Sequence, residues 1–217
     1  LMKEFIGGNQ RVKYFRLEKN MGNAYARNIA FSNSLGRYIA FMDDDDFWCD
    51  EKKLEKQISL LENSAPNVGL IFTKVRVLSD GGEESVPDIQ VPKDLRLHML
   101  KRNGIIYSPT VMVKRQLLEI TGGFDEKMPR GVDSEFYRSC FFRSQFEAVL
   151  LPDITTVIDE SGKDRMTLQG DRLNKIKVVR ANLRILRMYF RHFLIEPSAL
   201  MFRSRVIIKA LLGMIRI

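Results

Sequence analysis

GRYIAFMDDDD, residues 36–46, is the stretch that decides the fold. Its first part, Arg37 to Met42, is an almost continuous apolar run, which is typical of a strand that is buried on both faces in a parallel sheet. Four aspartates follow at the end of that strand. Four carboxylates in a row repel one another and gain little in a folded protein unless a cation or solvent compensates them. Because ligands of open α/β sheets bind beyond the carboxyl ends of the strands, we expect the aspartate run at a binding site.

The sequence on either side of this stretch alternates between predicted strands and predicted helices. We expect strands at residues 11–17, 37–42, 68–78, 105–113, 146–151 and 154–158. We expect helices at about 23–36 (ended by Gly36), 53–62 (with an apolar stripe of Leu54, Ile58 and Leu61), 94–102, 114–120 and 134–143, and from 171 onward with a break near Pro197. This alternation predicts an α/β fold in which helices flank a mostly parallel sheet. We divide the chain into a domain at residues 1–165 and a basic amphipathic helical extension at 166–217.

Length and composition narrow the class of protein. The 217 residues suit one domain with appendages, and a hydrophobic fraction of 45% is enough for a core. The net charge of +8 indicates an anionic partner: nucleic acid, acidic lipid or phosphorylated substrate. Two cysteines, Cys49 and Cys140, are too few for a disulfide framework and suit a reducing cytosol. No apolar run reaches the roughly 20 residues that span a bilayer, since Lys209 interrupts the longest one.

The aspartate run has two interpretations. Alternate residues of an extended segment point the same way, so Asp43 and Asp45 are expected to share one face. Mg²⁺ and Mn²⁺ take oxygen ligands, typically one or two carboxylates together with substrate phosphates. The other interpretation is a solvated acidic loop that caps the following helix. The position of the run at a strand end favours the metal site.

Several short motifs, taken in order, resemble the family 2 glycosyltransferases. They are Asn20-x-Gly22-x-x-x-Ala26-Arg27-Asn28, the stretch 36–46 with Lys53-Leu54 after it, Gly122-Gly123-Phe124-Asp125-Glu126, and Val132-Asp133-Ser134-Glu135-Phe136-Tyr137-Arg138. In that family, a comparable helix leads into a strand that ends in a D-x-D-D motif, and a G-G-F-D-E loop and an acidic helix start follow. The resemblance covers roughly residues 5 to 160.

The resemblance implies a GT-A fold (Rossmann-like) and inverting transfer of a sugar from a nucleotide-diphosphate sugar, most simply a UDP-sugar, to an acceptor hydroxyl. It implies Mn²⁺ or Mg²⁺ held chiefly by Asp45, with Asp43 and Asp44 near the metal and the nucleotide ribose and Asp46 as a neighbour. Gly123 would let the backbone approach the donor sugar. We assign Asn20, Gly22 and Arg27 to the donor side as well. Arg27 would pair with the diphosphate, although it equally suits the solvated face of a helix.

Asp133 looks like the family's general base, which takes the proton of the acceptor hydroxyl. The competing interpretation makes Asp133 the N-cap of a helix that begins at Ser134. Trp48 suits stacking on a sugar or, more simply, the edge of the core.

The sequence departs from the family pattern in two places. The family domain opens with a strand, turn and helix and a second strand, and none of these precedes Leu1, where residues 1–6 look like a helix end. We therefore expect the domain to be N-terminally incomplete. Many members also place a histidine metal ligand after the last core strand, where this chain has Asp159 as a possible substitute. The two histidines, His98 and His192, lie elsewhere.

The region from Asp171 onward mixes basic and large apolar residues at helical spacing. This pattern predicts either a helix that lies on the inner face of an anionic cell membrane without crossing it or an appendage packed on the domain. Many bacterial sugar transferases act on lipid-linked saccharide acceptors, which favours the membrane interpretation. We therefore expect a cytoplasmic protein with a role in polysaccharide or glycolipid synthesis. The alternatives are a non-catalytic membrane- or partner-binding module and a nucleic-acid binder. Nucleic-acid binding is not expected, because no known motif for it is present.

Overall fold

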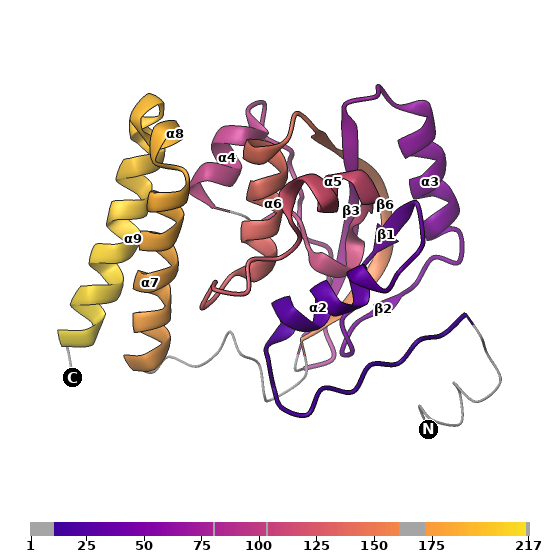
Figure 1. Ribbon diagram of the computed structural model, residues 1–217, viewed down its shortest axis with the longest axis horizontal. Coiled ribbons are helices and arrows are strands. Elements are labelled where there is room, and N and C mark those ends of the chain that lie inside the picture. The colour runs from indigo at the N-terminus through magenta and orange to yellow at the C-terminus, as the bar shows by residue number, and fades with distance from the viewer. Residues whose placement is uncertain (1–10, 80, 103, 161–171, 216–217) are drawn as a thin grey trace.

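The computed structural model describes residues 11–79, 81–102, 104–160 and 172–215. They form a sheet covered by helices on both faces, with a helical unit at one side (Figure 1). The strands are β1 (Tyr38–Ala40), β2 (Phe47–Trp48), β3 (Val68–Leu78), β4 (Glu84–Ser85), β5 (Met112–Lys114) and β6 (Glu147–Asp159). The helices are α2 (Asn23–Ser32), α3 (Lys53–Asn63), α4 (Leu95–Lys101), α5 (Arg115–Thr121), α6 (Val132–Arg143), α7 (Arg172–Met188), α8 (Phe190–Ile195) and α9 (Pro197–Ile215), with a 3₁₀ turn at Ser108–Thr110. The α/β architecture is confirmed.

The sheet is mixed, which corrects the expectation of a mostly parallel one. Its strand order is β1-β5-β3-β6-β2, with β4 on β3. Within the described residues only β3 and β6 pair in parallel, and β1 is an edge strand that pairs antiparallel with β5. The strand is also only half-buried, with Tyr38 and Ala40 against one core and Ile39 against the other, so the apolar run at residues 37–42 predicted more burial than the structure has. The run carried no information about the direction of the neighbouring strand.

Two helical layers cover the sheet. Along β3, Leu70 and Phe72 point into a core shared with α2, α4, α5 and α6, whereas Ile71 points into a second core under α3. The aromatic rings of Phe41, Phe124 and Phe136 pack edge to face or tilted at the centre of the first core, with centroids 4.6 to 6.1 Å apart. This cluster places the end of β1, the loop after α5 and the start of α6 next to one another.

Several predicted boundaries move. Residues 12–17 have no regular secondary structure and expose Tyr14 and Phe15, so the predicted strand there is wrong. The helix predicted to end at Gly36 ends at Ser32, and the predicted strand 105–113 is mostly loop and 3₁₀ turn. The two last strands are one continuous β6, with register shifts in its pairing to β3. In α3 the buried side is Lys53, Gln57 and Leu61, while Leu54 is exposed, because the helix turns two polar side chains inward.

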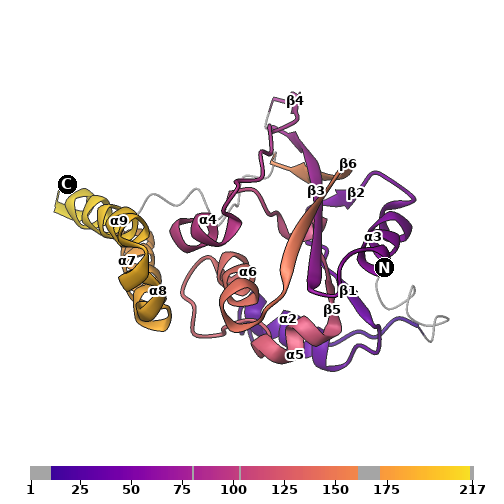
Figure 2. The same cartoon turned by 90° about the horizontal axis from the view of Figure 1, so that it is seen from above.

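The C-terminal helices form a unit that packs against α4 and α6 (Figure 2). Its shared core contains Leu100, Met128, Ala181, Ile185, Tyr189, Phe193 and Ala199. The break at Pro197 is confirmed, since Pro197 opens α9. Of the helices in the described part of the chain, none has the length and apolar character needed to cross a bilayer. The expected boundary at 165/166 and the expected helix end at 1–6 lie outside the described residues.

Candidate active site

The aspartate run follows β1 and enters β2 through a tight turn. Asp44 and Asp45 form the turn, which a bond from the Asp46 amide to the Asp43 carbonyl closes at 3.5 Å. The segment is therefore not extended, and the reason for expecting Asp43 and Asp45 on one face does not hold. Strand β2 pairs with β6, so the Asp159 amide donates to Asp46 Oδ1 at 3.2 Å. This pairing brings Asp159 next to the aspartate run, whereas its role as a substitute metal ligand stays a prediction.

Arg27 joins the two carboxylates that the sequence assigned to opposite roles. It lies on α2, and its Nη2 donates to Asp43 Oδ1 at 2.5 Å while its Nη1 donates to Asp133 Oδ1. Its side chain is only 14% exposed, and the guanidinium lies 5.3 Å from the ring centre of Phe124. The two carboxylates are about one third exposed, at 34% and 33%. A solvated-face role for Arg27 is excluded, and a cation with two partly solvated carboxylates now marks the site.

Asn20 and Gly22 shape the start of α2. Gly22 is the N-cap with φ of +84°, a conformation that glycine adopts without strain, and its carbonyl accepts from the Ala26 amide. The Asn20 Oδ1 accepts from the Gly22 amide at 2.9 Å. These contacts give both residues a structural role in positioning Arg27, one turn further along the helix. Their donor-binding role stays a prediction.

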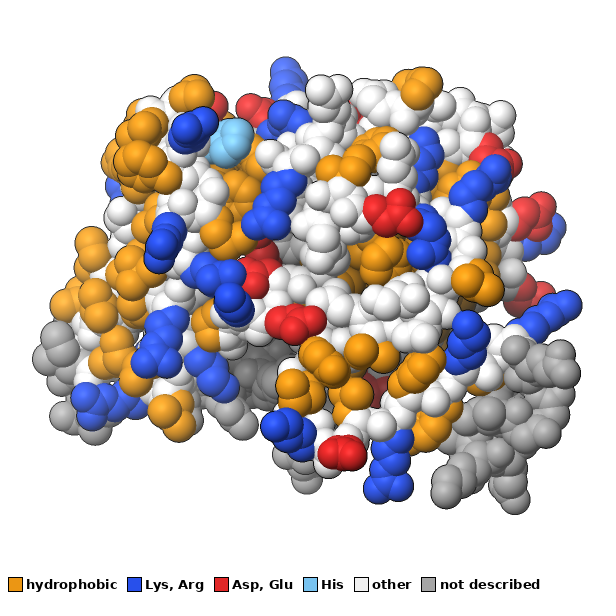
Figure 3. All heavy atoms as spheres, viewed as in Figure 1, with side chains coloured by type: hydrophobic (Ala, Val, Ile, Leu, Met, Phe, Trp, Pro, Cys, Tyr) orange, Lys and Arg blue, Asp and Glu red, His pale blue; other side chains and the backbone are white. Residues whose placement is uncertain are grey.

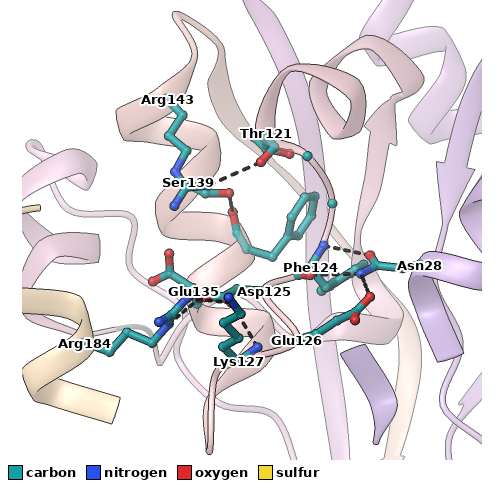
Figure 4. A pocket seen from close by; sticks show the side chains of 13 residues that line it. Asn28, Thr121, Phe124, Asp125, Glu126, Lys127, Glu135, Ser139, Arg143 and Arg184 are labelled. Atoms are coloured by element: carbon teal, nitrogen blue, oxygen red, sulfur yellow. Dashed lines mark hydrogen bonds and ion pairs between the residues drawn. The ribbon is translucent and has the colours of Figure 1, made fainter. Parts of the chain in front are cut away.

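The helix α2 is also bound to the loop after α5 (Figure 4). Asn28 Oδ1 accepts from the Phe124 amide at 2.9 Å, and Asn28 Nδ2 donates to the Phe124 carbonyl at 2.9 Å and to Glu126 Oε1 at 2.8 Å. A Cβ at position 123 would lie 2.6 Å from Asn28 Oδ1, and Gly123 has φ of +76°. Gly123 is thus required by the neighbouring Asn28. Asn28 stands in the same motif as Arg27, but its reciprocal bonds to the loop are visible only in the folded chain.

Asp133 lies inside the first turn of α6. The N-cap of that helix is Gly131, and no side chain caps it, so the interpretation of Asp133 as the N-cap is wrong. A carboxylate in the first turn of a helix still interacts favourably with the helix dipole. Its side chain pairs with Arg27 and caps no helix end.

Glu135, two residues further, was missed as a site residue. Its carboxylate is almost fully buried and accepts from Arg138 Nη1 at 2.8 Å and from the Tyr189 hydroxyl at 2.6 Å. Burial next to this carboxylate raises the pKa of the Tyr189 hydroxyl. Tyr189 follows α7, so the contact fastens the C-terminal helices to the first turn of α6. The i, i+3 spacing of Glu135 and Arg138 is a helix-surface signal that gave no hint of burial.

An ion pair also fastens the C-terminal helices to the loop after α5. Arg184 on α7 donates from Nε and Nη2 to the two carboxylate oxygens of Asp125, at 2.6 and 2.9 Å. The Asp125 carboxylate raises the pKa of the Arg184 guanidinium. A cavity of about 440 Å³ lies between this loop, α6 and α7 (Figure 4). The C-terminal helices therefore hold two walls of the candidate site.

The residues present suit a cation shared with a substrate. Among the described residues, no group of three or more His, Cys, Asp or Glu side chains could enclose a metal by itself. Mg²⁺ and Mn²⁺ need only one or two carboxylates when phosphates complete the shell. Asp44 and Asp45 are exposed in the turn, so their carboxylates are accessible for such a site.

Trp48 and His192 pack within the fold, and neither histidine stands at the aspartate run. Trp48 Nε1 donates to the Pro109 carbonyl at 2.9 Å, which favours its role at the edge of the core. His98 lies on α4, and His192 packs its ring 4.6 Å from that of Phe142 in the C-terminal unit. Both cysteines are free, Cys49 exposed and Cys140 buried.

Sequence comparison matches more than half of the chain, from its N-terminal end, to one protein family. The sequence model described as "Glycosyl transferase family 2" matches residues 1–119. The putative teichuronic acid biosynthesis glycosyltransferase TuaG of Bacillus subtilis is 33% identical over 117 residues, covering 54% of this chain and 45% of TuaG. The UDP-Glc:alpha-D-GlcNAc-diphosphoundecaprenol beta-1,3-glucosyltransferase WfgD of Escherichia coli is 32% identical over 110 residues, covering 51% of this chain and 42% of WfgD. The chain spans a little under half the length of these relatives.

Solved structures give the same fold at low identity. The S. aureus TarS 1–349 complex with UDP-GlcNAc superposes with a TM-score of 0.60 at 16% identity, covering 88% of this chain and 59% of that one. The mannosyltransferase PcManGT from Pyrobaculum calidifontis, in complex with GDP-Man and Mn²⁺, superposes with a TM-score of 0.52 at 19% identity, covering 90% of this chain and 54% of that one. The predicted GT-A fold is confirmed.

Proposed function

Because this chain belongs to glycosyltransferase family 2, we propose that it carries out inverting, metal-dependent transfer of a sugar from a nucleoside-diphosphate donor to an acceptor hydroxyl. One observation carries the proposal. Arg27 holds Asp43, which comes from the aspartate run, and Asp133, which comes from α6, at a single guanidinium. The carboxylate assigned to the donor and the carboxylate assigned to the acceptor thus meet at one point, as a direct displacement requires.

Asp133 is the general base in this proposal. The acceptor oxygen forms its bond to the anomeric carbon while the bond from that carbon to the donor diphosphate breaks. The hydroxyl proton passes to Asp133, and the electron pair leaves with the nucleoside diphosphate. Arg27 pairs with the phosphate oxygens of the donor in the bidentate way that guanidinium groups favour, which releases Asp133 from its ion pair.

Asp45, with Asp43 and Asp44 beside it, would hold the divalent cation together with the diphosphate. The exposure of Asp44 and Asp45 in the turn supports this assignment. The cation, Mn²⁺ or Mg²⁺, supplies Lewis-acid stabilisation of the charge that builds on the leaving group. Asn20, Gly22 and Gly123 shape the donor side through the backbone of α2 and of the loop after α5.

Relatives guide the choice of substrates. TarS was solved with UDP-GlcNAc, and the name of WfgD gives a UDP-sugar donor and a diphosphoundecaprenol-linked acceptor. We propose a UDP-sugar donor and a saccharide acceptor linked to lipid through a diphosphate, in the synthesis of a cell-surface polysaccharide. The reaction would then take place at the cytoplasmic face of the membrane that holds the acceptor.

The C-terminal unit supports a peripheral position on that membrane. Of the chain totals of 35 Lys and Arg and 27 Asp and Glu, residues 172–217 contain 11 basic residues and one acidic residue, Glu196. The unit packs on the domain, as one of the two interpretations held, yet it also leaves large apolar side chains in solvent: Leu173, Leu183, Phe190, Leu194, Ile195, Leu200, Met201, Ile208, Leu211 and Leu212. Figure 3 shows apolar and basic side chains side by side over these helices. The proposed membrane contact would therefore use a different face of this unit from the one that packs on the domain.

Binding of UDP in the presence of Mn²⁺, measured by calorimetry, tests the proposed activity. We expect the chain to bind UDP with Mn²⁺ and to lose this binding in Asp45→Asn, while the control Asp88→Asn, an exposed carboxylate outside the site, keeps it. Mn²⁺-independent binding, or equal binding in both variants, would contradict the metal assignment. Absence of UDP binding together with sedimentation on anionic vesicles would favour a non-catalytic membrane-binding module.

Sedimentation with phosphatidylglycerol vesicles tests the membrane position. We expect the chain to bind at low salt and to dissociate as salt screens the basic side chains. Replacing Met201 and Ile208 on α9 by Ser removes apolar contact without a change of charge. Unchanged vesicle binding in this variant would show that the apolar face plays no part.

A further inference from the structure

We propose that a second cavity, lined by arginines beside the first turn of α6, binds the diphosphate of the acceptor. This arginine cavity has a volume of about 210 Å³ and lies between α4, α6, α7 and α9. Its polar lining comes from Arg102, Arg130, Ser134, Arg138, Asn182 and Arg203. No acidic side chain in the described part of the chain lines it. The proposal rests on the proposed function for the identity of the ligand, whereas the anion site itself follows from the geometry.

Two of the arginines are buried and face one carboxylate between them. Arg138 donates from Nε to the Met99 carbonyl and from Nη1 to Glu135. Arg203, only 7% exposed, donates from Nε to the Leu100 carbonyl and from Nη1 to Asn182 Oδ1. Glu135 also accepts from Tyr189, so this single carboxylate already serves two donors.

Arg203 Nη2 identifies the cavity as an incomplete site. This nitrogen is buried and has no hydrogen-bond partner within the described residues. Burial, and next the charge of Arg138, lower the pKa of Arg203. The pKa falls to about 9, which is still above neutral pH, so the Arg203 guanidinium keeps its positive charge. A buried guanidinium with a free donor is costly unless an anion completes it.

The start of α6 adds further donors to the same cavity. Gly131 is the N-cap of this helix of 12 residues, and both Gly131 and Ser134 line the cavity. Free backbone N–H groups and the helix dipole at such an end favour an anion. Arg130 and Arg102 stand at the outer edge, where Arg130 donates to Asn174 Oδ1 at 2.6 Å. Four arginines and a helix start line one cavity, and these are the donors that proteins use to bind phosphate oxygens.

The position of the cavity points to the acceptor. Ser134 directly follows Asp133, so the cavity lies about 100° around the helix from the general base. Its volume is several times the roughly 30 Å³ of a water molecule and below the usual range for whole ligands. A phosphate or diphosphate fits that size, and the sugar attached to it would extend toward Asp133. Helices α7 and α9, which carry the basic and apolar face, form the other wall, so a lipid attached to the diphosphate would leave toward the membrane.

A structural explanation of the arginines must be tested alongside. Arg138 and Arg203 both bind carbonyls at the end of α4, which is a normal task for a cation at a helix C-terminus. That task explains the hydrogen bonds that their Nε atoms donate. It does not explain Arg102, whose side chain is exposed at the rim, or the absence of any carboxylate from the lining.

Calorimetric titration of the chain with inorganic pyrophosphate and with inorganic phosphate, in EDTA, tests the site while the metal-dependent donor site is silent. We expect pyrophosphate to bind more tightly than phosphate. Arg102→Gln, at the rim, and Arg203→Met, inside the cavity, should each weaken pyrophosphate binding by about tenfold or more. The control Arg187→Gln changes the same charge on an exposed part of α7 outside the cavity and should change the affinity less than twofold. Pyrophosphate should also raise the melting temperature of the native chain and of the control, but not that of Arg102→Gln.

Each other outcome overturns the proposal. No pyrophosphate binding in EDTA, or equal weakening in the control, means that the arginines are structural or that binding is diffuse. Weaker binding to phosphatidylglycerol vesicles in Arg102→Gln, with pyrophosphate affinity unchanged, assigns the arginines to lipid headgroups. Binding of UDP with Mn²⁺ is measured separately in the same variants. A variant that loses pyrophosphate binding but keeps UDP binding shows a defect in this cavity alone. If the native chain does not bind UDP, it is the proposed activity that fails.

Discussion

The region around Arg27 and the region around Arg203 both remove an arginine from solvent, but they compensate its charge differently. Arg27 has two carboxylates in direct contact, Asp43 and Asp133, and both are partly solvated. Arg203 has two neutral oxygens and one nitrogen without a partner among the described residues. The first region is complete in electrostatic terms before a substrate arrives, and the second is not. A donor must therefore compete for Arg27, whereas an anion would complete Arg203.

The same contrast holds for the two parts of the chain. Residues 1–171 carry 24 Lys and Arg against 26 Asp and Glu, which leaves 11 against one in residues 172–217. The positive excess of the whole protein thus belongs to the C-terminal helices. Total net charge alone could not show this, and it suggested nucleic acid as readily as lipid or phosphate.

The largest expected effect concerns the carboxylates of the first region. Asp45→Asn should abolish divalent-dependent sugar transfer, because the cation loses its main ligand at the leaving group. Transfer from a radiolabelled UDP-sugar to a lipid-linked acceptor measures it, with circular dichroism as the check on folding. Asp45 is exposed in a turn, so the folded structure should survive. Full Mn²⁺-dependent transfer by the variant would break the assignment of this region to a cation.

The next effect concerns the acceptor side of Arg27. Asp133→Asn should lower turnover by about 10²-fold or more, the usual range for loss of a general base, with UDP affinity largely kept. Steady-state kinetics with both substrates varied separates turnover from binding. If UDP affinity falls while turnover is unchanged, Asp133 belongs to the donor side. Both carboxylates that pair with Arg27 would then serve the donor, and neither would serve the acceptor.

A smaller effect compares the two arginines directly through stability. Arg27→Met leaves two neighbouring carboxylates without their cation and should lower the free energy of unfolding by about 2–3 kcal/mol. Arg203→Met loses two hydrogen bonds but also removes a buried charge, so it should cost less, on the order of 1 kcal/mol. Urea unfolding of both variants in phosphate-free buffer makes the measurement. A larger loss in Arg203→Met would show that Arg203 is already compensated, and the contrast would fail.

Much of the fold was predictable because burial leaves a pattern in sequence. The strand 68–78 was predicted with the observed bounds, and the helices 53–62, 114–120 and 134–143 were predicted to within two residues at either end. Strand direction was not predictable, since the apolar run at 37–42 reads the same for parallel and antiparallel neighbours. The prediction of a strand at 11–17 was wrong, because the local sequence does not show whether another strand is available to pair with it.

The site was predictable only where its residues stand in motifs. The sequence brought attention to Arg27, Asp43 and Asp133 but could not show that one guanidinium joins them across 106 residues of chain. Asn28 and Glu135 stand in the quoted motifs, but their roles were not predictable because they depend on partners from the loop after α5 and from the C-terminal helices. Contacts between segments that are distant in the chain produce no periodic pattern in the local sequence, so a single sequence does not reveal them.

The smallest expected effect uses a third buried cation to calibrate the other two. Lys53 is 1% exposed, its Nζ donates to Gln57 Oε1 at 2.6 Å, and it lies 4.8 Å from the ring of Trp48. Burial lowers the pKa of Lys53 to about 8, an effect that the charge of Asp50 partly offsets. A lysine, unlike an arginine, can relieve burial by releasing its proton. Between about pH 8 and the ordinary lysine pKa of about 10.4, the unfolded chain binds one more proton than the folded chain, so this group makes stability rise with pH.

Lys53→Met should remove that rise. The pKa difference sets an upper limit of about 3 kcal/mol for it, and we expect on the order of 1 kcal/mol, because the bonds to Gln57 and Trp48 retain part of the charged form. Urea unfolding of the native chain and the variant at pH 7, 8, 9 and 10 measures the difference, with Lys52→Met, an exposed neighbour, as the control. The native chain and the control should gain stability relative to Lys53→Met as the pH rises. A difference that stays constant with pH would mean that Lys53 keeps its proton at little cost. A buried cation without a carboxylate in direct contact would then be tolerable in this protein, and Arg203 would need no anion to explain it.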